Sequence, residues 1–148
     1  MLKKPINYIS LAIIALTFAC NKNGEVSFKE NENGVKYYFY NDEDGETAKL
    51  GEFVTAHFRF KTAKDSVLRD SWNEGNPIQF MVQKPTFKGG LEEMLTMVSV
   101  GDSLTFRISS DSLFEKTFMA PMPPFIEKGS FVAFDMKIIK IQNKEEFE

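Results

Sequence analysis

Cysteine and histidine are nearly absent from this chain of 148 residues, which contains one of each. Cys20 and His57 cannot assemble a zinc site built from Cys and His side chains, since such a site needs several ligands. A single cysteine also excludes an internal disulfide. A serine–histidine triad would have to use His57, but the alternation of apolar and polar residues around it predicts that its ring lies on the solvent side of a strand.

Phosphate-binding motifs and basic patches are missing as well. Gly89-Gly90 matches neither a P-loop nor a dinucleotide-binding fingerprint. Asp42 and Asp44 lie in an acidic turn that lacks the ligand spacing and the terminal Glu of an EF-hand. The 18 basic and 21 acidic residues are mixed along the chain, with a net charge of −3 and no basic stripe. We therefore expect no metal, no cofactor and no nucleic acid as a partner.

The chain also lacks an apolar run long enough for a membrane span near its N-terminus. The mostly apolar run from Ile9 to Leu16 is short, because spanning a bilayer takes about 20 apolar residues. Lys3 and Lys4 precede this run, and Cys20 follows it. That layout predicts a secretory signal peptide over residues 1–20. The alternative is a buried N-terminal helix of the folded domain.

Cys20 stands where a signal peptidase would leave it as the first residue of the mature protein. Attachment of a lipid would remove a free thiol that is a liability outside the cell. Ala19 fits the lipoprotein motif, whereas Thr17 stands where Leu is usual. Thr17-Phe18-Ala19 also fits an ordinary small-x-small cleavage site. The segment resembles that of a bacterial lipoprotein, so we expect a lipid anchor in the cell envelope. Asn21, where a retention Asp often stands, favours the outer membrane.

The mature chain divides into a linker, one domain and a tail. Residues 21–33 are polar and have the composition of a flexible linker. Residues 143–148 form a charged tail that is expected to fray. Residues 34–142 lie between them as a single domain without internal repeats.

The domain has mostly the period of β-strands. Apolar and polar residues alternate in Phe53–Lys61, Ser103–Ser109 and Val132–Ile138, which predicts half-buried antiparallel strands with one solvated side. Lys36–Tyr40 is aromatic-rich and ends in an acidic turn, which also predicts a strand. One segment differs, because Leu91, Met94, Leu95 and Val98 follow helical spacing and Gly101 is a suitable end. The sequence predicts an α+β fold, with a twisted antiparallel sheet wrapped around one short α-helix.

Phenylalanine is the residue type in excess, with 15 in the chain. Six of them come from different segments: Phe58, Phe80, Phe87, Phe114, Phe125 and Phe134. They either fill one core together, or some of them line an apolar pocket beside the helix.

Three stretches in order resemble the FKBP family of prolyl isomerases, between Gly34 and Ile141. Val54–Phe58 resembles the family's strand ending in a His-Tyr pair. Gly90–Ile108 resembles its single helix, the glycine after it and the next strand, and Pro123–Ile141 resembles its Pro-Pro loop and last strand. The resemblance implies the fold given above and a site for proline-containing polypeptide segments.

The family's pocket can be transferred onto this chain with several departures. Phe58 and Phe114 replace two Tyr residues, and Leu91 replaces the Trp of the pocket floor. Arg69 aligns with the pocket Asp, although Asp70 takes that place if the loop shifts by one residue. The remaining lining positions are Leu68, Ile78, Phe80, Phe87, Met122 and Phe134.

Two functions from different classes follow from the resemblance. The first is a peptidyl-prolyl cis–trans isomerase, whose chemistry needs no nucleophile or metal because an apolar cradle can favour the twisted amide. The second is a non-catalytic module that binds a partner or an unfolded chain in the same groove or at the insertion that begins with Phe125. The retained apolar lining of the pocket favours the isomerase. The replacement of the family's polar pocket groups favours the non-catalytic module. A third possibility is a plain small β-domain without a groove.

Overall fold

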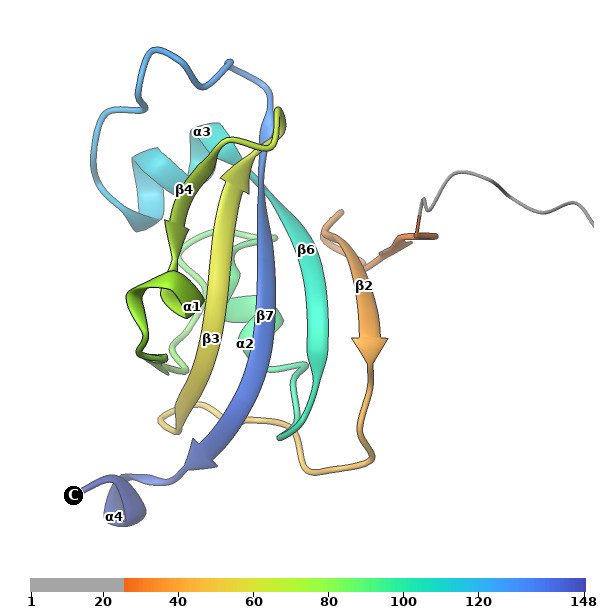
Figure 1. Ribbon diagram of the computed structural model, residues 1–148, viewed down its shortest axis with the longest axis vertical. Helices are drawn as coiled ribbons and strands as arrows, with labels where there is room; N and C mark the ends of the chain where they lie inside the picture. Colours follow the sequence, from red (N-terminus) through yellow and green to blue (C-terminus); the bar gives the residue numbers. More distant parts are fainter. Residues whose placement is uncertain (1–25) are drawn as a thin grey trace, which may run out of the picture.

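The computed structural model describes residues 26–148. The predicted signal peptide, Cys20 and the first residues of the predicted linker lie outside this range. The described part contains an antiparallel sheet and five short helices (Figure 1). None of these helices has the length and apolar character needed to cross a membrane.

One antiparallel sheet forms the framework (Figure 1). The strands β3 (Phe53–Thr62) and β7 (Phe131–Gln142) lie at its centre and pair along all of β3. On the far side of β7 follow β6 (Ser103–Ser109) and then β2 (Lys36–Asn41). Short edge strands are β1 (Lys29–Glu30) beside β2, and β4 (Val67–Asp70) and β5 (Ile78–Met81), which both pair with β3.

The alternation seen in the sequence decides which side chains face the core. In β3, Val54, Ala56 and Phe58 are buried, whereas Thr55 and His57 are partly exposed. The corresponding buried residues of β6 and β7 are Leu104, Phe106, Ile108, Val132, Phe134, Met136 and Ile138. We call the side of the sheet that carries these residues the inner face and the opposite side the outer face. The predicted half-buried strands are confirmed.

The helix α2 (Leu91–Leu95) packs against the inner face and lies behind the sheet in Figure 1. Its apolar residues Leu91, Met94 and Leu95 join the core. Helical spacing in the sequence continues to Val98, but α2 ends earlier, with Thr96 as its C-cap. Gly101 serves the turn into β6, where a φ of +95° and the Glu43 side chain, 2.9 Å from an added Cβ, leave room for glycine alone.

Four further short helices surround the sheet and were not predicted: α1 (Ser71–Glu74), α3 (Ser110–Ser112), the π-helix η1 (Leu113–Thr117) and α4 (Lys144–Phe147). Each follows a strand or continues another helix and spans five residues or fewer. The predicted α+β class is therefore correct, while the expectation of a single helix was wrong. Short helices such as these give too few turns for a periodic pattern to be recognised.

Both ends of the domain extend beyond the boundaries predicted from composition. The segment predicted as a flexible linker contains β1, and Asn31 and Asn33 each donate a side-chain hydrogen bond to Glu93, at 2.7 and 2.9 Å. The segment predicted as a frayed tail contains α4, which begins with a capping box at Asn143. Phe147 of α4 stacks on Phe53 with 3.9 Å between ring centroids. Both predicted boundaries need correction, because specific contacts order these polar segments.

Candidate functional site

Aromatic rings of β3 and its neighbours form a continuous stack on the inner face. Phe58 is 4% exposed, contacts the edge of Phe80 at 5.5 Å and stacks on Phe60 at 5.6 Å. Phe60 in turn stacks on Phe134 at 5.4 Å, and Phe134 stacks on Phe106 at 5.2 Å. These separations lie in the range of favourable aromatic contacts. We call this set, with the residues added below, the aromatic cluster.

The aromatic cluster reaches the surface through the segment that follows β6. Ser109 accepts a hydrogen bond from the Ser112 N–H at 3.4 Å and starts α3, which continues into η1. Phe114 of η1 meets Phe118 edge to face at 5.3 Å, and Phe118 lies 6.1 Å from Phe60. Because Phe118 is 39% exposed, an apolar path leads from the core to solvent.

The structure brings most of the predicted site residues together. Phe58, Leu91 and Phe134 are buried members of the core cluster, and the predicted residues packed against it are Leu68, Ile78, Phe80, Phe87 and Phe114. Met122 lines a hollow of about 340 Å³ together with Phe114. The polar residues of that hollow are Asp111, Glu115 and Lys128. The site residues therefore form one region, with core packing at Phe134 and partial exposure at Phe114.

The register of β4 decides between the two candidates for the family's pocket aspartate. Arg69 pairs with Phe60 and Val67 pairs with Lys61, so a bulge at Leu68 absorbs one residue. Residues directly opposite each other in antiparallel strands share a face. Arg69 therefore lies on the inner face, where its guanidinium is 5.5 Å from the centroid of the Phe58 ring.

Arg69 is also held by a carboxylate. Its Nε and Nη2 donate to the two oxygens of Glu74 at 3.0 and 3.1 Å. This hydrogen bond, opposed by desolvation and assisted by the charge of Glu74, raises the pKa of Arg69 above its ordinary value. Arg69 therefore places a permanent positive charge beside the ring of Phe58.

Asp70 lies on the outer face instead, opposite Arg59. Its carboxylate accepts from Arg59 Nε at 2.7 Å and caps α1 by accepting from the N–H groups of Trp72 and Asn73 at 3.0 and 3.3 Å. Burial alone would raise the pKa of Asp70, but the hydrogen bonds from Arg59, Asn73 and Trp72 outweigh it and lower the pKa. The alternative in which Asp70 enters the pocket is therefore not what the structure shows.

His57 lies on the outer face, as the sequence predicted. Its Nδ1 is 3.0 Å from Ser71 Oγ, and the Phe58 N–H donates to the same oxygen at 2.8 Å. The Ser71 hydroxyl thus accepts from the Phe58 N–H and lies within hydrogen-bond distance of His57 Nδ1. The ring of His57 stacks on Trp72 at 5.3 Å. His57 faces away from the aromatic cluster and serves packing there.

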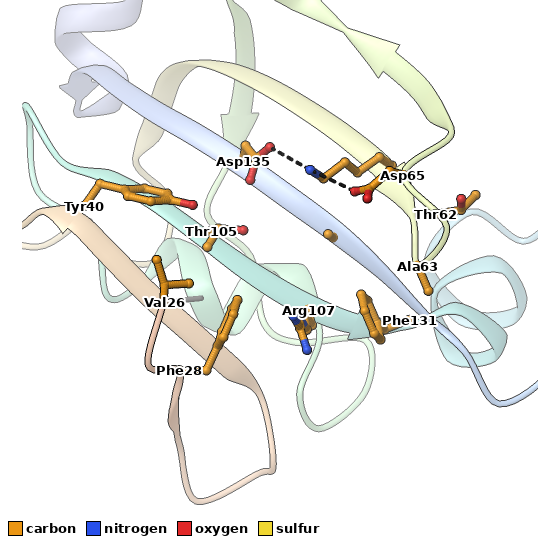
Figure 2. Close-up of a pocket in the computed structure, with 12 residues that line it drawn as sticks. Val26, Phe28, Tyr40, Thr62, Ala63, Asp65, Thr105, Arg107, Phe131 and Asp135 are labelled. Carbon is orange, nitrogen blue, oxygen red and sulfur yellow. Dashed lines mark ion pairs between the residues drawn. The ribbon is translucent and has the colours of Figure 1, made fainter. Parts of the chain in front are cut away.

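A second hollow lies on the outer face, between the sheet, residues 26–28 and the turn after β3 (Figure 2). Its volume is about 530 Å³. Arg107 lies between two rings, 4.2 Å from Phe28 and 4.5 Å from Phe131. Lys61 contacts Asp65 at 3.2 Å and Asp135 at 3.9 Å. This hollow is lined mainly by charged and polar groups, so it does not suit a proline ring.

Three members of the aromatic cluster are not among the site residues predicted from the sequence: Phe60, Phe106 and Phe118. Phe60 shares its alternating face with Phe58, so the period of β3 could have identified it. Phe118 follows a π-helix, whose irregular period offers no such signal. Among residues 26–148 no three His, Cys, Asp or Glu side chains gather in a way that could hold a metal ion.

Comparison with known proteins identifies the class to which this arrangement belongs. The sequence profile of the family described as FKBP-type peptidyl-prolyl cis-trans isomerase matches residues 44–139, well over half of the chain. The chain therefore belongs to this family.

Individual relatives agree with this assignment. Peptidyl-prolyl cis-trans isomerase FKBP15-2 of Arabidopsis thaliana is 26% identical over 136 residues, covering 92% of this chain and 79% of the relative. FKBP15-1 of the same plant is 26% identical over 138 residues, covering 93% and 85%.

Solved structures show the same fold. FkpA from Escherichia coli superposes with a TM-score of 0.63 at 18% identity, over 81% of this chain and 54% of that one. The present chain therefore spans about half the length of FkpA. The N-terminal domain of FKBP42 from Arabidopsis thaliana gives a TM-score of 0.63 at 12% identity, over 82% of this chain and 96% of that one. The predicted FKBP-like fold is confirmed.

Proposed function

We propose that this protein is an active peptidyl-prolyl cis–trans isomerase that assists protein folding in a bacterial cell envelope, anchored there through a lipid on Cys20. The observation that carries the enzymatic part is the aromatic cluster, which runs without interruption from the buried Phe58 to the exposed Phe118. Family membership makes the reaction class the natural expectation for such a surface.

The chemistry needs only what this cluster offers. Turning an X-Pro bond costs roughly 20 kcal/mol because amide resonance is lost in the twisted state. Apolar rings that hold the proline and exclude water disfavour the polar planar amide relative to the twisted one. No covalent bond forms or breaks, so neither a nucleophile nor a proton relay is required.

The residue at position 114 limits the expected rate. Phe114 has a ring where the family resemblance implies a Tyr hydroxyl that hydrogen-bonds the substrate carbonyl. A hydrogen bond of this kind contributes about 0.5–1.5 kcal/mol, which corresponds to up to about tenfold in rate. We therefore expect weak but measurable isomerisation.

The test is an exchange measurement by NMR of the cis and trans forms of short proline peptides, with the purified full chain in detergent. Substitutions Phe87→Ala and Leu91→Ala should abolish turnover, since Leu91 belongs to the core cluster under the site and Phe87 packs against it. Phe114→Tyr should raise it, by up to about tenfold. Absence of turnover with every peptide, from a protein with the circular dichroism of a folded sheet, would reject the enzymatic proposal.

A non-catalytic binding module is the second candidate, and the segment after η1 favours it. In this segment Met119 is 85% exposed and Phe125 is 62% exposed, and Phe118 just before it is 39% exposed. Such apolar side chains suit contact with an unfolded chain. Under this alternative, Phe114→Tyr leaves turnover at zero, while Phe125→Ser weakens the binding of an unfolded polypeptide.

The anchor is tested separately. Expression in bacteria with a radioactive fatty acid should label the wild-type chain, and Cys20→Ser should abolish the label. Fractionation of inner and outer membranes then tests the expected outer-membrane location, for which Asn21 after the cysteine is the support. Release of an unlabelled chain cleaved after Ala19 would support an ordinary signal peptide instead.

A further inference from the structure

Two cationic side chains lie over two rings of the candidate site. The guanidinium of Arg69 is 5.5 Å from the centroid of Phe58, and the ammonium of Lys116 is 5.9 Å from the centroid of Phe87. Both separations fall within the distance at which a cation is attracted to an aromatic face. Both rings belong to or pack on the core cluster that contains the site. The two charges therefore stand beside the surface on which a proline segment would lie.

The two cations differ in their partners. Glu74 occupies two N–H donors of Arg69, and both side chains are exposed, at 45% and 43%. The other N–H groups of the guanidinium make no hydrogen bond within residues 26–148. Lys116 makes no ion pair within residues 26–148. Each cation thus retains the capacity to bind another carboxylate.

Acidic groups are present nearby, but most have defined positions of their own. Asp111 accepts a hydrogen bond from the Gly129 N–H at 2.6 Å. Glu115 lines the hollow beside Met122 with Asp111, together with Lys128. Glu74 binds Arg69 in a two-bond geometry, which demonstrates that this guanidinium can receive a carboxylate where it stands.

From this arrangement we propose that Arg69 and Lys116 make the site select proline segments in which an acidic residue adjoins the proline. This selectivity rests on the proposed function, the binding of proline segments, and specifies which class of proline segment is preferred. An arginine is well suited to this role, because its planar group stacks on a ring and holds a carboxylate at the same time. Glu74 acts as an internal competitor for the substrate's carboxylate.

The size of the effect follows from the exposure of the charges. Ion pairs between exposed groups contribute about 0.2–1 kcal/mol, which corresponds to up to about fivefold in affinity per pair. Salt screens such pairs, so the preference should shrink as the ionic strength rises toward about 1 M.

The experiment compares matched peptides that differ only beside the proline, with Glu, Gln or Lys at the position before or after it. Binding by NMR titration and cis–trans exchange are both measured on the full chain in detergent. We expect the order Glu, then Gln, then Lys in affinity, with Glu favoured over Gln by roughly two- to fivefold. Arg69→Gln and Lys116→Gln should each reduce this ratio toward one, and Glu74→Gln should increase it.

The matched control is Lys140→Gln, which removes the same charge from an exposed position of β7. It should leave the ratio as in the wild type. Peptides that bind with equal affinity whatever their charge overturn the proposed selectivity while leaving proline binding intact. A chain that binds none of the peptides rejects the proposed function itself, and the selectivity with it.

Discussion

The inner and the outer face of the sheet both carry aromatic side chains, but among residues 26–148 the longer run of ring-on-ring contacts lies on the inner face. On the inner face rings contact rings, as in the stack of Phe106 on Phe134. On the outer face the guanidinium of Arg107 lies between Phe28 and Phe131, and Tyr38 meets Tyr40 edge to face. The same strands supply both sets, because successive residues point to opposite sides. Ring-on-ring contact produces a dry apolar surface, whereas ring-on-cation contact remains compatible with water.

The largest difference between the faces should appear in stability. Phe106 is 0% exposed and stacks on Phe134. Phe106→Ala should lower the free energy of unfolding by about 3–5 kcal/mol, the usual cost of removing a buried phenyl ring. Tyr40→Ala on the outer face, where the ring is 60% exposed, should change it by no more than about 0.5 kcal/mol. Urea unfolding followed by circular dichroism measures both, and equal losses would contradict the assignment of the two faces.

The next effect concerns a residue that joins β3 to α1. Ser71 is fully buried, and its hydroxyl accepts from the Phe58 N–H while facing His57 Nδ1. Ser71→Ala should cost about 1–3 kcal/mol, because the buried N–H of Phe58 loses its partner. The exposed Ser27 supplies a control, since Ser27→Ala should have little effect on the unfolding midpoint. A neutral Ser71→Ala would show that the hydrogen bond does not fix the backbone under the site.

A smaller effect should be found where the N-terminal segment crosses the outer face. Phe28→Ala removes one of the rings around Arg107 and should cost about 0.5–1 kcal/mol, the range for an exposed cation–aromatic contact. Arg107→Gln should cost a similar amount. The double variant should lose less than the sum of the two, because both changes remove the same contact. Additive losses in urea unfolding would show that Phe28 contributes without Arg107.

The strands of this fold are predictable from the sequence because each long strand has one wet face. The alternation around Phe58 or Phe106 is strong enough to place a whole strand. Arg69 and Asp70 illustrate what alternation leaves open, since a bulge of one residue exchanges the faces that they occupy. The bulge arises from the register of β4 against β3, and the local sequence of β4 does not show that register.

The ends of the domain escaped prediction for a related reason. The polar composition of residues 21–33 predicts a linker, but Glu93 accepts hydrogen bonds from Asn31 and Asn33 across a long separation in sequence. Phe147 was the sole large apolar residue in the predicted tail, and its stacking on Phe53 orders α4. Composition describes what a segment does alone, whereas these segments are ordered by partners elsewhere in the chain.

The smallest expected effect tests the ion pair of the outer face and appears only in acid. Because Asp70 has a lowered pKa in the folded state, folding favours its charged form. Its contribution to stability is complete above the pKa of an unfolded Asp, about 3.9, and is lost as the pH falls through the lower folded value. Asp70→Asn should therefore be less stable than the wild type near neutral pH and should lose less stability than the wild type below about pH 4.

Thermal unfolding from pH 7 to pH 2.5 follows this difference, with Asp44→Asn as a control for the change in net charge. The inner face carries Arg69 in the equivalent pair with Glu74, whose two side chains are both exposed, whereas the Asp70 side chain is 6% exposed. The acid response should therefore follow Asp70 more than Glu74, since solvent screens the exposed pair. Equal effects of Asp70→Asn and Glu74→Gln on the loss of thermal stability in acid would contradict this explanation. They would show that the burial of the Asp70 carboxylate does not distinguish the two ion pairs.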